Sequence, residues 1–335
     1  METNSLRSSR FDVGLVVKNG MPHLPTALRS LELQTHRDFR LVVQDGVSTD
    51  GTLDVLEAFK KWSGFEVEIV SEVDSGVAEA YNRLIRRVKS PFLAYLDSDN
   101  FYLPDHLEKA LDFYGGNPDH AVYVSSHIMV GADGNPSHYF RAPLPDFFGA
   151  LLCHSRVPSG SAVYKMELAR AELRYRTDLG HTPDYESWLR LLVSGLKIHS
   201  SPEPTYCTRL SDASAGCDWE RYPEFCLSME RGLEHFLEHC SPEALRAWIR
   251  NAGRGGIHAW AAYHLSRQPG MEEMAERMER QAIAFYPAAP AYFAFGGLKG
   301  EQALPVDAIE KRFESVRELL GIAARPVAAE NKFKR

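Results

Sequence analysis

Two aspartates one residue apart are the residues of this chain best suited to do chemistry. Asp97 and Asp99 directly follow the apolar run 92–96. Five apolar residues predict a buried strand, and residues two apart at its end can address the same ligand. Two carboxylates held so close need a cation between them or a raised pKa. Their hard oxygens suit Mg²⁺ or Mn²⁺, with phosphate oxygens completing the coordination shell.

The surrounding segments must decide between a ligand site and a simple turn, because a turn uses the same residue types. Apolar runs predict strands over 11–17, 39–43 and 65–70 before the run at 92–96, and helical periodicity links them. This alternation predicts an α/β fold, with a mostly parallel sheet flanked by helices on both faces. Ligands of such sheets lie beyond the carboxyl ends of the strands.

Three successive strands of this prediction end in acidic loops. Asp45 ends the second strand, Glu72 and Asp74 follow the third, and Asp97 follows the fourth. Three such loops on one edge predict a site that uses hydrogen-bond acceptors and a metal ion. No Gly-x-Gly-x-x-Gly loop or Walker lysine loop follows the first strand, so a phosphate ligand would need that metal.

Composition narrows the class of protein. The chain has 335 residues, 44% of them hydrophobic, which is enough for two domains or one large domain with an extension. A net charge of −7 argues against a nucleic-acid partner. We expect no secretory signal, because the first ten residues are polar, and no transmembrane segment, because no apolar run approaches about 20 residues. Five cysteines without a Cys-x-x-Cys pair fit reduced thiols and a cytoplasmic location.

Four motifs, in order over roughly residues 10–210, resemble one known family. Residues 45–52 read DGVSTDGT, which resembles the first signature of family 2 glycosyltransferases with a GT-A fold. Residues 30–34 are similar to the Ser-Ile-x-x-Gln stretch of that family, and residues 72–76 resemble the branch that acts in bacterial cell-surface polysaccharide synthesis. Asp97-Ser98-Asp99 stands where the family has its metal motif. One departure is Gly46, where many members have a second Asp.

The resemblance implies a role for each candidate residue. Asp99, helped by Asp97, would hold Mn²⁺ or Mg²⁺, Asp45 would accept from the N–H of the nucleotide base, and Arg209 would lie beside the diphosphate. His154 falls in a segment that family members place close to the transferred sugar. The full set of expected donor-binding residues is Val17, Asn19, Asp45, Glu72, Asp74, Gly76, Asn82, Asp97, Ser98, His154 and Arg209.

A second acidic pair lies at a predicted helix start. Thr182-Pro183 is a good beginning for a helix, and Asp184 and Glu186 are favourable in its first turn. The plain interpretation of both acids is favourable helix-end electrostatics. Residues 184–190 read DYESWLR, which is similar to the family segment whose first acid is the catalytic base. The resemblance therefore implies Asp184 as general base, with Glu186 as the competing candidate.

Beyond residue 216 the pattern changes to amphipathic helices. They are predicted over 219–240, 242–267, 271–285 and 306–320. We therefore expect a GT-A catalytic domain over 1–215 and a helical appendage over 216–335 that binds an acceptor or partner.

The function expected from the resemblance is an inverting, metal-dependent transfer of sugar. The donor would be a nucleotide-diphosphate sugar, with UDP favoured, and the acceptor a glycan or lipid-linked hydroxyl, reached in the cytoplasm or at the periphery of the inner membrane. A nucleotidylyltransferase is one alternative, although residues 18–20 are a poor version of its Gly-rich basic loop. A non-catalytic nucleotide-sugar-binding protein is another, although it would have no chemical need of Asp97, Asp99 and Asp184 together.

Overall fold

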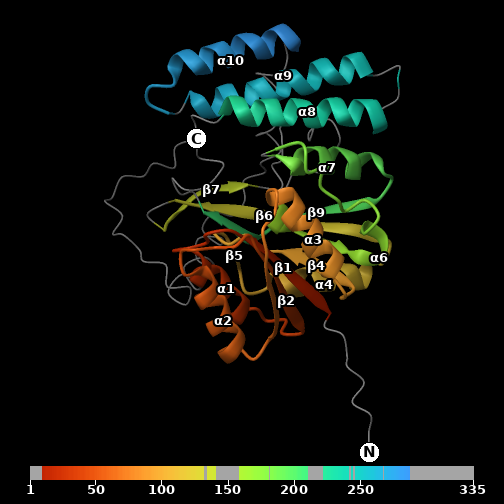
Figure 1. The fold of residues 1–335 in the computed structure, drawn as a ribbon. Coiled ribbons are helices and arrows are strands. Elements are labelled where there is room, and N and C mark those ends of the chain that lie inside the picture. Colours follow the sequence, from red (N-terminus) through yellow and green to blue (C-terminus); the bar gives the residue numbers. More distant parts are fainter. Residues whose placement is uncertain are drawn as a thin grey trace, which may run out of the picture.

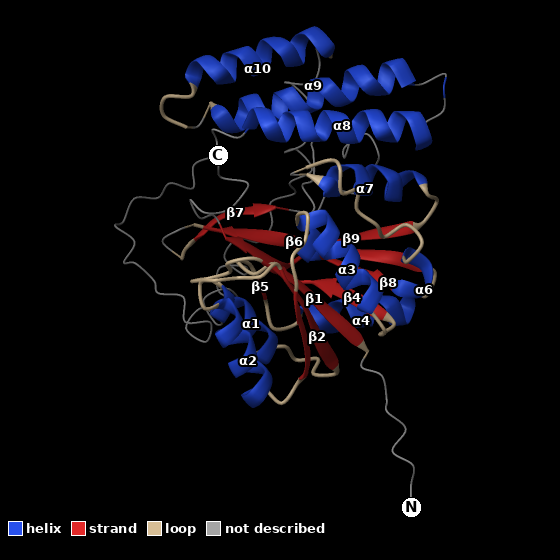
Figure 2. Ribbon diagram, viewed as in Figure 1, coloured by secondary structure: helices blue, strands red, loops and turns tan. Residues whose placement is uncertain are grey.

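One twisted sheet organises the molecule (Figure 1). The computed structural model describes residues 10–131, 134–140, 158–180, 182–209, 222–240, 243, 246–266 and 268–286. Strands follow the order β3-β2-β1-β4-β8-β6-β9-β5, and β7 pairs with β6. Helices flank this sheet, and three further helices form a separate layer beside it (Figure 2).

The first half of the sheet is parallel and forms the edge that carries the acidic loops. Its strands are β3 (Glu66–Ser71), β2 (Phe39–Asp45), β1 (Phe11–Val17) and β4 (Phe92–Tyr95). Phe11 lies opposite both Phe39 and Phe92, so the strands run side by side in the same direction. Their carboxyl ends therefore meet at one edge, as the alternation of strands and helices predicts.

The second half of the sheet is mixed, because β8 runs antiparallel to both β4 and β6, and β5 antiparallel to β9. Only β9 pairs in parallel with β6 among the described neighbours in this half. The elements here are β5 (Phe101–Tyr102), α4 (His106–Gly116), β6 (His120–Val130), β7 (Pro136–Phe140), η1 (Ser159–Ser161), β8 (Ala162–Lys165), α6 (Met166–Ala169) and β9 (Lys197–Arg209). This half returns β9 to the edge where β4 ends.

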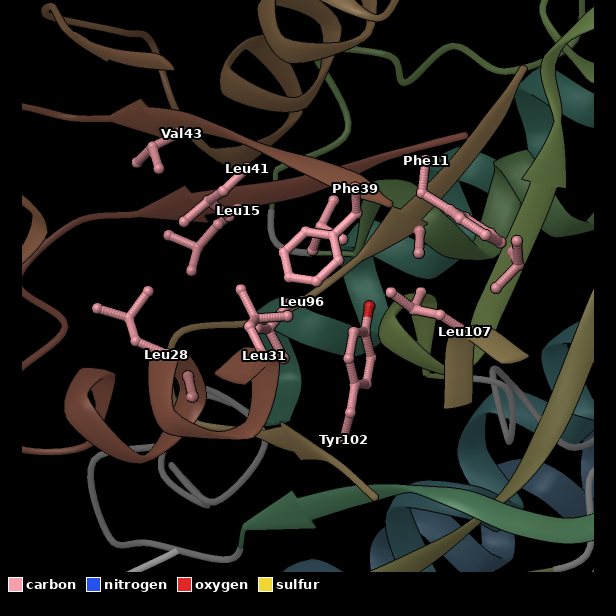
Figure 3. Packing of buried hydrophobic residues seen from close by; sticks show 14 of the residues in the cluster. Phe11, Leu15, Leu28, Leu31, Phe39, Leu41, Val43, Leu96, Tyr102 and Leu107 are labelled. Carbon is pink, nitrogen blue, oxygen red and sulfur yellow. The ribbon is translucent and has the colours of Figure 1, made fainter. Parts of the chain in front are cut away.

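Alternate residues of the strands form two separate hydrophobic cores, one on each face of the sheet. Phe11, Leu15 and Leu41 pack on one face against α1 (Leu24–Glu32), α2 (Thr52–Trp62) and α4 (Figure 3). Val42 and Leu93 point to the other face, against α3 (Val77–Arg87) and α6. Strand side chains alternate between faces, so both faces of β1–β4 must be covered.

The last four helices of the described residues pack in sequence onto this scaffold. They are α7 (Pro183–Val193), α8 (Tyr222–Cys240), α9 (Arg246–Leu265) and α10 (Glu272–Phe285). Figure 1 shows α7 between the sheet and the layer of α8, α9 and α10. Trp188 and Leu191 pack with the sheet core, whereas Tyr185 and Leu189 pack with α8–α10. Helix α7 is therefore shared by the core on the α3 face of the sheet and by a third core formed with α8–α10.

Most predicted elements are present, with shifted ends. Strand β4 ends at Tyr95, so Asp97 and Asp99 lie on the following loop instead of the strand itself. The strand expected before Arg209 begins earlier, at Lys197. The domain boundary at 215/216 and the helix expected over 306–320 lie outside the described residues. Within the described part, no helix has the length and apolar character needed to cross a membrane.

Candidate active site

Hydrogen bonds join the loop after β1 to the loop after β2. The Asn19 amide donates to the Ser48 hydroxyl at 2.8 Å, and the Asn19 side-chain oxygen accepts from the Thr49 amide at 2.9 Å. The Gly20 amide donates to the Thr52 hydroxyl at 2.8 Å. Asn19 has a positive φ of 56°, which its short polar side chain tolerates. Asn19 thus shapes the loop edge, and its contact with a donor stays a prediction.

One residue in the loop after β2 has a strained backbone conformation. Val47 is β-branched, 43% exposed, and has a φ of +59°. Such a conformation costs on the order of 1–3 kcal/mol and tends to persist where function requires it. A Cβ at the neighbouring Gly46 would lie 2.9 Å from the Asp74 carboxylate, so a larger residue there would require the Asp74 side chain to move. The loops after β2 and β3 therefore meet at Gly46.

Asp45 is fully buried at the end of β2. Its carboxylate accepts hydrogen bonds from the Ser48 amide at 3.1 Å and from the Ser71 hydroxyl at 2.6 Å. These bonds fix the second loop to the end of β3. Nucleotide-base recognition by Asp45 remains a prediction, and its replacement would also loosen the loop.

Other predicted donor residues support the same edge from within the protein. Val17 is 3% exposed, and its carbonyl accepts from the Gly46 amide at 2.9 Å. Glu72 pairs with Arg83 at 3.2 Å, and Asp74 accepts from the Gly76 amide at 2.9 Å. These contacts order the strand ends around the loop carrying Asp97, and binding of the donor by these residues stays a prediction.

Asp97 is held by three hydrogen-bond donors. Tyr81 donates at 2.9 Å, Tyr206 at 2.6 Å, and the Asn100 side-chain Nδ2 at 3.1 Å. Burial, together with the charge of Asp97, raises the pKa of both Tyr81 and Tyr206 well above the ordinary value, so both hydroxyls stay protonated. A carboxylate offers about four acceptor positions, so three bonds leave room for one further contact. Asp97 is therefore fixed in place and can still receive a cation or a ribose hydroxyl.

Asp99 lies beside a guanidinium. The Arg209 side chain donates to the Asp99 carbonyl at 3.2 Å, and the Arg209 amide donates to Asn100 at 2.8 Å. The last residue of β9 is thereby fastened to the loop that follows β4. An arginine held beside a candidate metal carboxylate suits a diphosphate, because its charge is permanent and it can bind two oxygens. Ser98 completes this contact region by packing against Gly20.

The donor set at this loop fits a hard divalent cation. Among the described residues no three His, Cys, Asp or Glu side chains gather as a metal-binding group. Mg²⁺ and Mn²⁺ do not require one, because they bind through one or two carboxylates and take the remaining ligands from phosphates and water. The half-buried Asp99 carboxylate, with the one open position of Asp97, provides such a set.

Helix α7 brings its first acid to the same group of tyrosines. Burial raises the pKa of Tyr175, and the adjacent Asp184 carboxylate raises it further. The Tyr175 and Tyr81 rings lie 5.2 Å apart between centroids, and Tyr81 donates to Asp97. Asp97 and Asp184 are therefore linked through the Tyr81–Tyr175 pair, Asp97 by a hydrogen bond and Asp184 by its charge, although they lie 87 positions apart in the sequence.

The second acid of this turn lies on the other side of the helix. Glu186 is fully buried, and its carboxylate lies 3.2 Å from Arg190 and 3.3 Å from His235. A buried, paired carboxylate cannot receive a proton from a substrate hydroxyl. The geometry therefore argues against Glu186 as the general base, and the role of Asp184 stays a prediction.

Two predicted donor-binding residues, Asn82 and His154, remain to be considered. Asn82 donates to the Tyr175 carbonyl at 2.6 Å and accepts from the Tyr175 amide at 2.9 Å. Both ends of its amide thus hold the tyrosine next to Asp184, and any direct donor contact stays a prediction. His154 lies outside the described residues.

A separate cleft of about 570 Å³ lies between α8 and residues 176–179. Its charged groups largely satisfy each other, since Arg176 pairs with Asp178 and Arg254 with Glu234 at 3.2 Å. This internal pairing distinguishes it from the strand edge, where carboxylates of three loops converge.

Solved glycosyltransferases share this fold. TarS residues 1–349 from S. aureus align with a TM-score of 0.55 at 15% identity, covering 86% of this chain and 92% of that one. The mannosyltransferase PcManGT from Pyrobaculum calidifontis, solved with GDP-Man and Mn²⁺, gives 0.58 at 16% identity and covers 95% and 87% of the two chains. The fold is the GT-A glycosyltransferase fold, which confirms the fold class predicted from the sequence.

Sequence comparison gives the family. Residues 12–169 match the family described as glycosyl transferase family 2. The teichuronic acid biosynthesis glycosyltransferase TuaG of Bacillus subtilis is 26% identical over 190 residues, or 55% of this chain and 73% of TuaG. A PGL/p-HBAD biosynthesis glycosyltransferase of Mycobacterium bovis is 35% identical over 115 residues, or 34% of this chain and 45% of the relative. Residues 12–169 thus resemble glycosyl transferase family 2, and the protein is a glycosyltransferase.

The two tyrosines that hold Asp97 carry no local sequence signal, and one of them gives a first test. Tyr206→Phe keeps the ring but removes the hydroxyl at 2.6 Å from Asp97. We expect weaker donor affinity with little change in melting temperature, because a net hydrogen bond contributes only about 1 kcal/mol to folding. Calorimetric titration with UDP and Mn²⁺, beside a thermal melt, measures both.

Gly160→Ala serves as the partner variant. Its Cβ would lie 2.3 Å from the Tyr206 hydroxyl, so the whole ring must move. We expect it to lose affinity as Tyr206→Phe does and, in addition, to lower the melting temperature. Unchanged affinity in both variants would show that the Tyr206 bond to Asp97 is irrelevant to donor binding.

Proposed function

We propose that this protein transfers a sugar from a nucleotide-diphosphate donor, with UDP favoured, to an acceptor hydroxyl in glycan or surface polysaccharide synthesis. The observation that carries the proposal is the arrangement at the edge where the loops after β1–β4 meet: Asp97 accepts from Tyr81, whose ring lies 5.2 Å from that of Tyr175, and the charge of Asp184 acts on Tyr175. Relatives named for teichuronic acid and PGL/p-HBAD biosynthesis support the pathway class, and structures solved with UDP-GlcNAc and with GDP-Man support the donor class.

The proposed chemistry is a direct displacement with inversion. Asp184 takes the proton of the acceptor hydroxyl while the acceptor oxygen forms a bond to the anomeric carbon. The bond from that carbon to the phosphate oxygen breaks, and its electron pair leaves with the diphosphate. Arg209 compensates the charge developing on the leaving group. A divalent cation at Asp99, when bound, would supply further charge neutralisation.

Among the described residues of α7, one acid can serve as base and the other is buried in an ion pair, which agrees with inversion. Retention by double displacement needs an additional carboxylate that attacks the anomeric carbon. On α7, Glu186 is buried and paired, so Asp184 is the acid of this turn that can meet substrate. A non-catalytic nucleotide-sugar-binding protein has no use for a general base, so the proposed role of Asp184 argues against that alternative.

A panel of nucleoside diphosphates tests the donor assignment. We expect UDP with Mn²⁺ to raise the melting temperature most, compared with GDP, CDP and dTDP under the same conditions. Ligand at 100 times its dissociation constant adds about 2.7 kcal/mol to the free energy of unfolding. EDTA should remove most of that gain. A larger rise in melting temperature with GDP would identify guanine, not uracil, as the base of the donor nucleotide. No rise with any nucleotide would contradict the proposed donor site.

A further inference from the structure

A single hydroxyl of the helical region holds the segment that leads into α7. Ser228, on α8, is 3% exposed. Its hydroxyl accepts from the Thr182 amide at 3.1 Å and from the Thr182 hydroxyl at 2.8 Å, and it donates to the Leu179 carbonyl. A serine hydroxyl can donate one bond and accept two, so Ser228 uses its whole hydrogen-bonding capacity on this segment.

These bonds replace the usual local fixing of a helix start. Thr182 is the N-cap of α7, where a threonine side chain normally accepts from an amide of the first turn. Here Thr182 makes no such cap bond, because its hydroxyl is turned to Ser228. The position of the α7 N-terminus is therefore set by α8, and Asp184 lies two residues after Thr182.

The packing one turn further along α8 has the same effect. Gly232 lies four residues after Ser228 on the same face of α8. A Cβ at Gly232 would lie 3.3 Å from the Glu186 Cβ and 3.6 Å from Leu179. The two helices are thus in close contact on both sides of Asp184, and a shift of α8 would carry the start of α7 with it.

We propose that Ser228 is a positioning residue for the transfer reaction, acting through the N-terminal turn of α7 to hold Asp184 at the acceptor. This inference rests on the proposed function of Asp184 as general base. It makes the helices beyond residue 216 part of the machinery for transfer, because one of them sets the geometry of the base. Positioning matters at this scale, since a misplacement of about 1 Å can cost on the order of 10²-fold in rate.

A double-mutant cycle on the full chain tests the proposal. The four proteins are wild type, Ser228→Ala, Asp184→Asn and the double variant. The measured quantities are the affinity for UDP and the single-turnover rate of UDP-sugar hydrolysis, with water as the acceptor. We expect Ser228→Ala to keep UDP affinity and to lower the rate about tenfold. In the Asp184→Asn background, the same change should have no further effect.

The results distinguish a failure of the positioning role of Ser228 from a failure of Asp184 as the proposed base. An equal loss from Ser228→Ala in both backgrounds, or no loss in the wild-type background, overturns the positioning role. A normal rate in Asp184→Asn alone overturns the proposed base, whatever Ser228→Ala does. Ser126→Ala is the matched control, because Ser126 is also buried and donates to a main-chain carbonyl, Ser201, at 2.8 Å. It should lower stability without the tenfold loss of rate.

A second variant guards against misfolding of Ser228→Ala. Thr182→Val removes the other hydroxyl of the pair while Ser228 stays in place, and Thr182→Ser retains the hydroxyl. We expect Thr182→Val to reproduce the tenfold loss and Thr182→Ser to restore most of the rate. A normal rate in a folded Thr182→Val protein would also overturn the positioning role.

Discussion

Asp184→Asn is expected to bind the donor normally and to transfer sugar about 10²–10⁴ times more slowly than wild type. The amide has nearly the shape of the carboxylate but cannot accept the proton of the acceptor hydroxyl. Asp184 lies in the first turn of α7, where a negative charge is favourable. The charge of Asp184 raises the pKa of Tyr175, whose ring lies 5.2 Å from that of Tyr81, the tyrosine that donates to Asp97.

Single-turnover hydrolysis of a UDP-sugar and calorimetric titration with UDP measure the two effects separately. Glu186→Gln is the control, because Glu186 lies on the same turn but is buried against Arg190 and His235. We expect the control to melt earlier and to keep its rate per folded molecule, since removing one charge of a buried pair destabilises the fold. Normal turnover in Asp184→Asn with loss in Glu186→Gln would transfer the role of base to Glu186.

Asp99→Ala is expected to abolish the dependence of UDP binding on a divalent cation. Without the cation, the Asp99 carboxylate repels the diphosphate, so its removal should leave metal-free binding unchanged or improved. With Mn²⁺, the variant loses the attraction that the ion provides. The ratio of UDP affinities with Mn²⁺ and with EDTA should therefore fall towards one.

The fold should survive this change, because Asp99 is only half-buried on a loop. Calorimetric titrations of UDP with Mn²⁺ and with EDTA give the ratio directly. Asp54→Ala, on the exposed face of α2, controls for the loss of one negative charge. An Mn²⁺ enhancement in Asp99→Ala equal to that of wild type would show that the cation binds elsewhere.

The sequence was sufficient for the parts of the site that depend on local patterns. Apolar runs and helical periodicity predicted β1–β4 with the helices between them, and the carboxyl ends of those strands do meet. Asp45, Asp74 and Asp97 could therefore be placed at one edge of the sheet from the sequence alone. The helix start at Thr182-Pro183 was equally local, because Pro183 is pre-organised for the first helical position.

Residues that act across long sequence separations could not be predicted in this way. Tyr206 reaches Asp97 over 109 positions through the pairing of β9 beside β5, which has no local signal. The strands β5 and β8 have two and four residues, too short for a periodicity to show. Gly46 could be noted as a departure from the family, but only the structure shows that Asp74 occupies the space of its missing side chain.

The role of the helical region also depended on tertiary packing. The change of composition after residue 216 predicted a helical appendage over 216–335, and on that prediction alone a truncation after Ala215 should keep donor binding. The structure places Tyr185 and Leu189 of α7 in one core with α8–α10. Such a truncation would expose both side chains and release the start of α7 from Ser228. The loops after β1–β4 would keep their own core, so we expect the base to be affected before the donor site.

The stereochemistry of donor hydrolysis tests the central claim most directly. Wild-type protein is mixed with an α-linked UDP-sugar and Mg²⁺, and proton NMR follows the first sugar anomer released to water before mutarotation. Displacement assisted by Asp184 predicts the β-anomer first, with no release in EDTA and almost none in Asp184→Asn. Release of the α-anomer first, or release at the same rate in EDTA, would contradict the account.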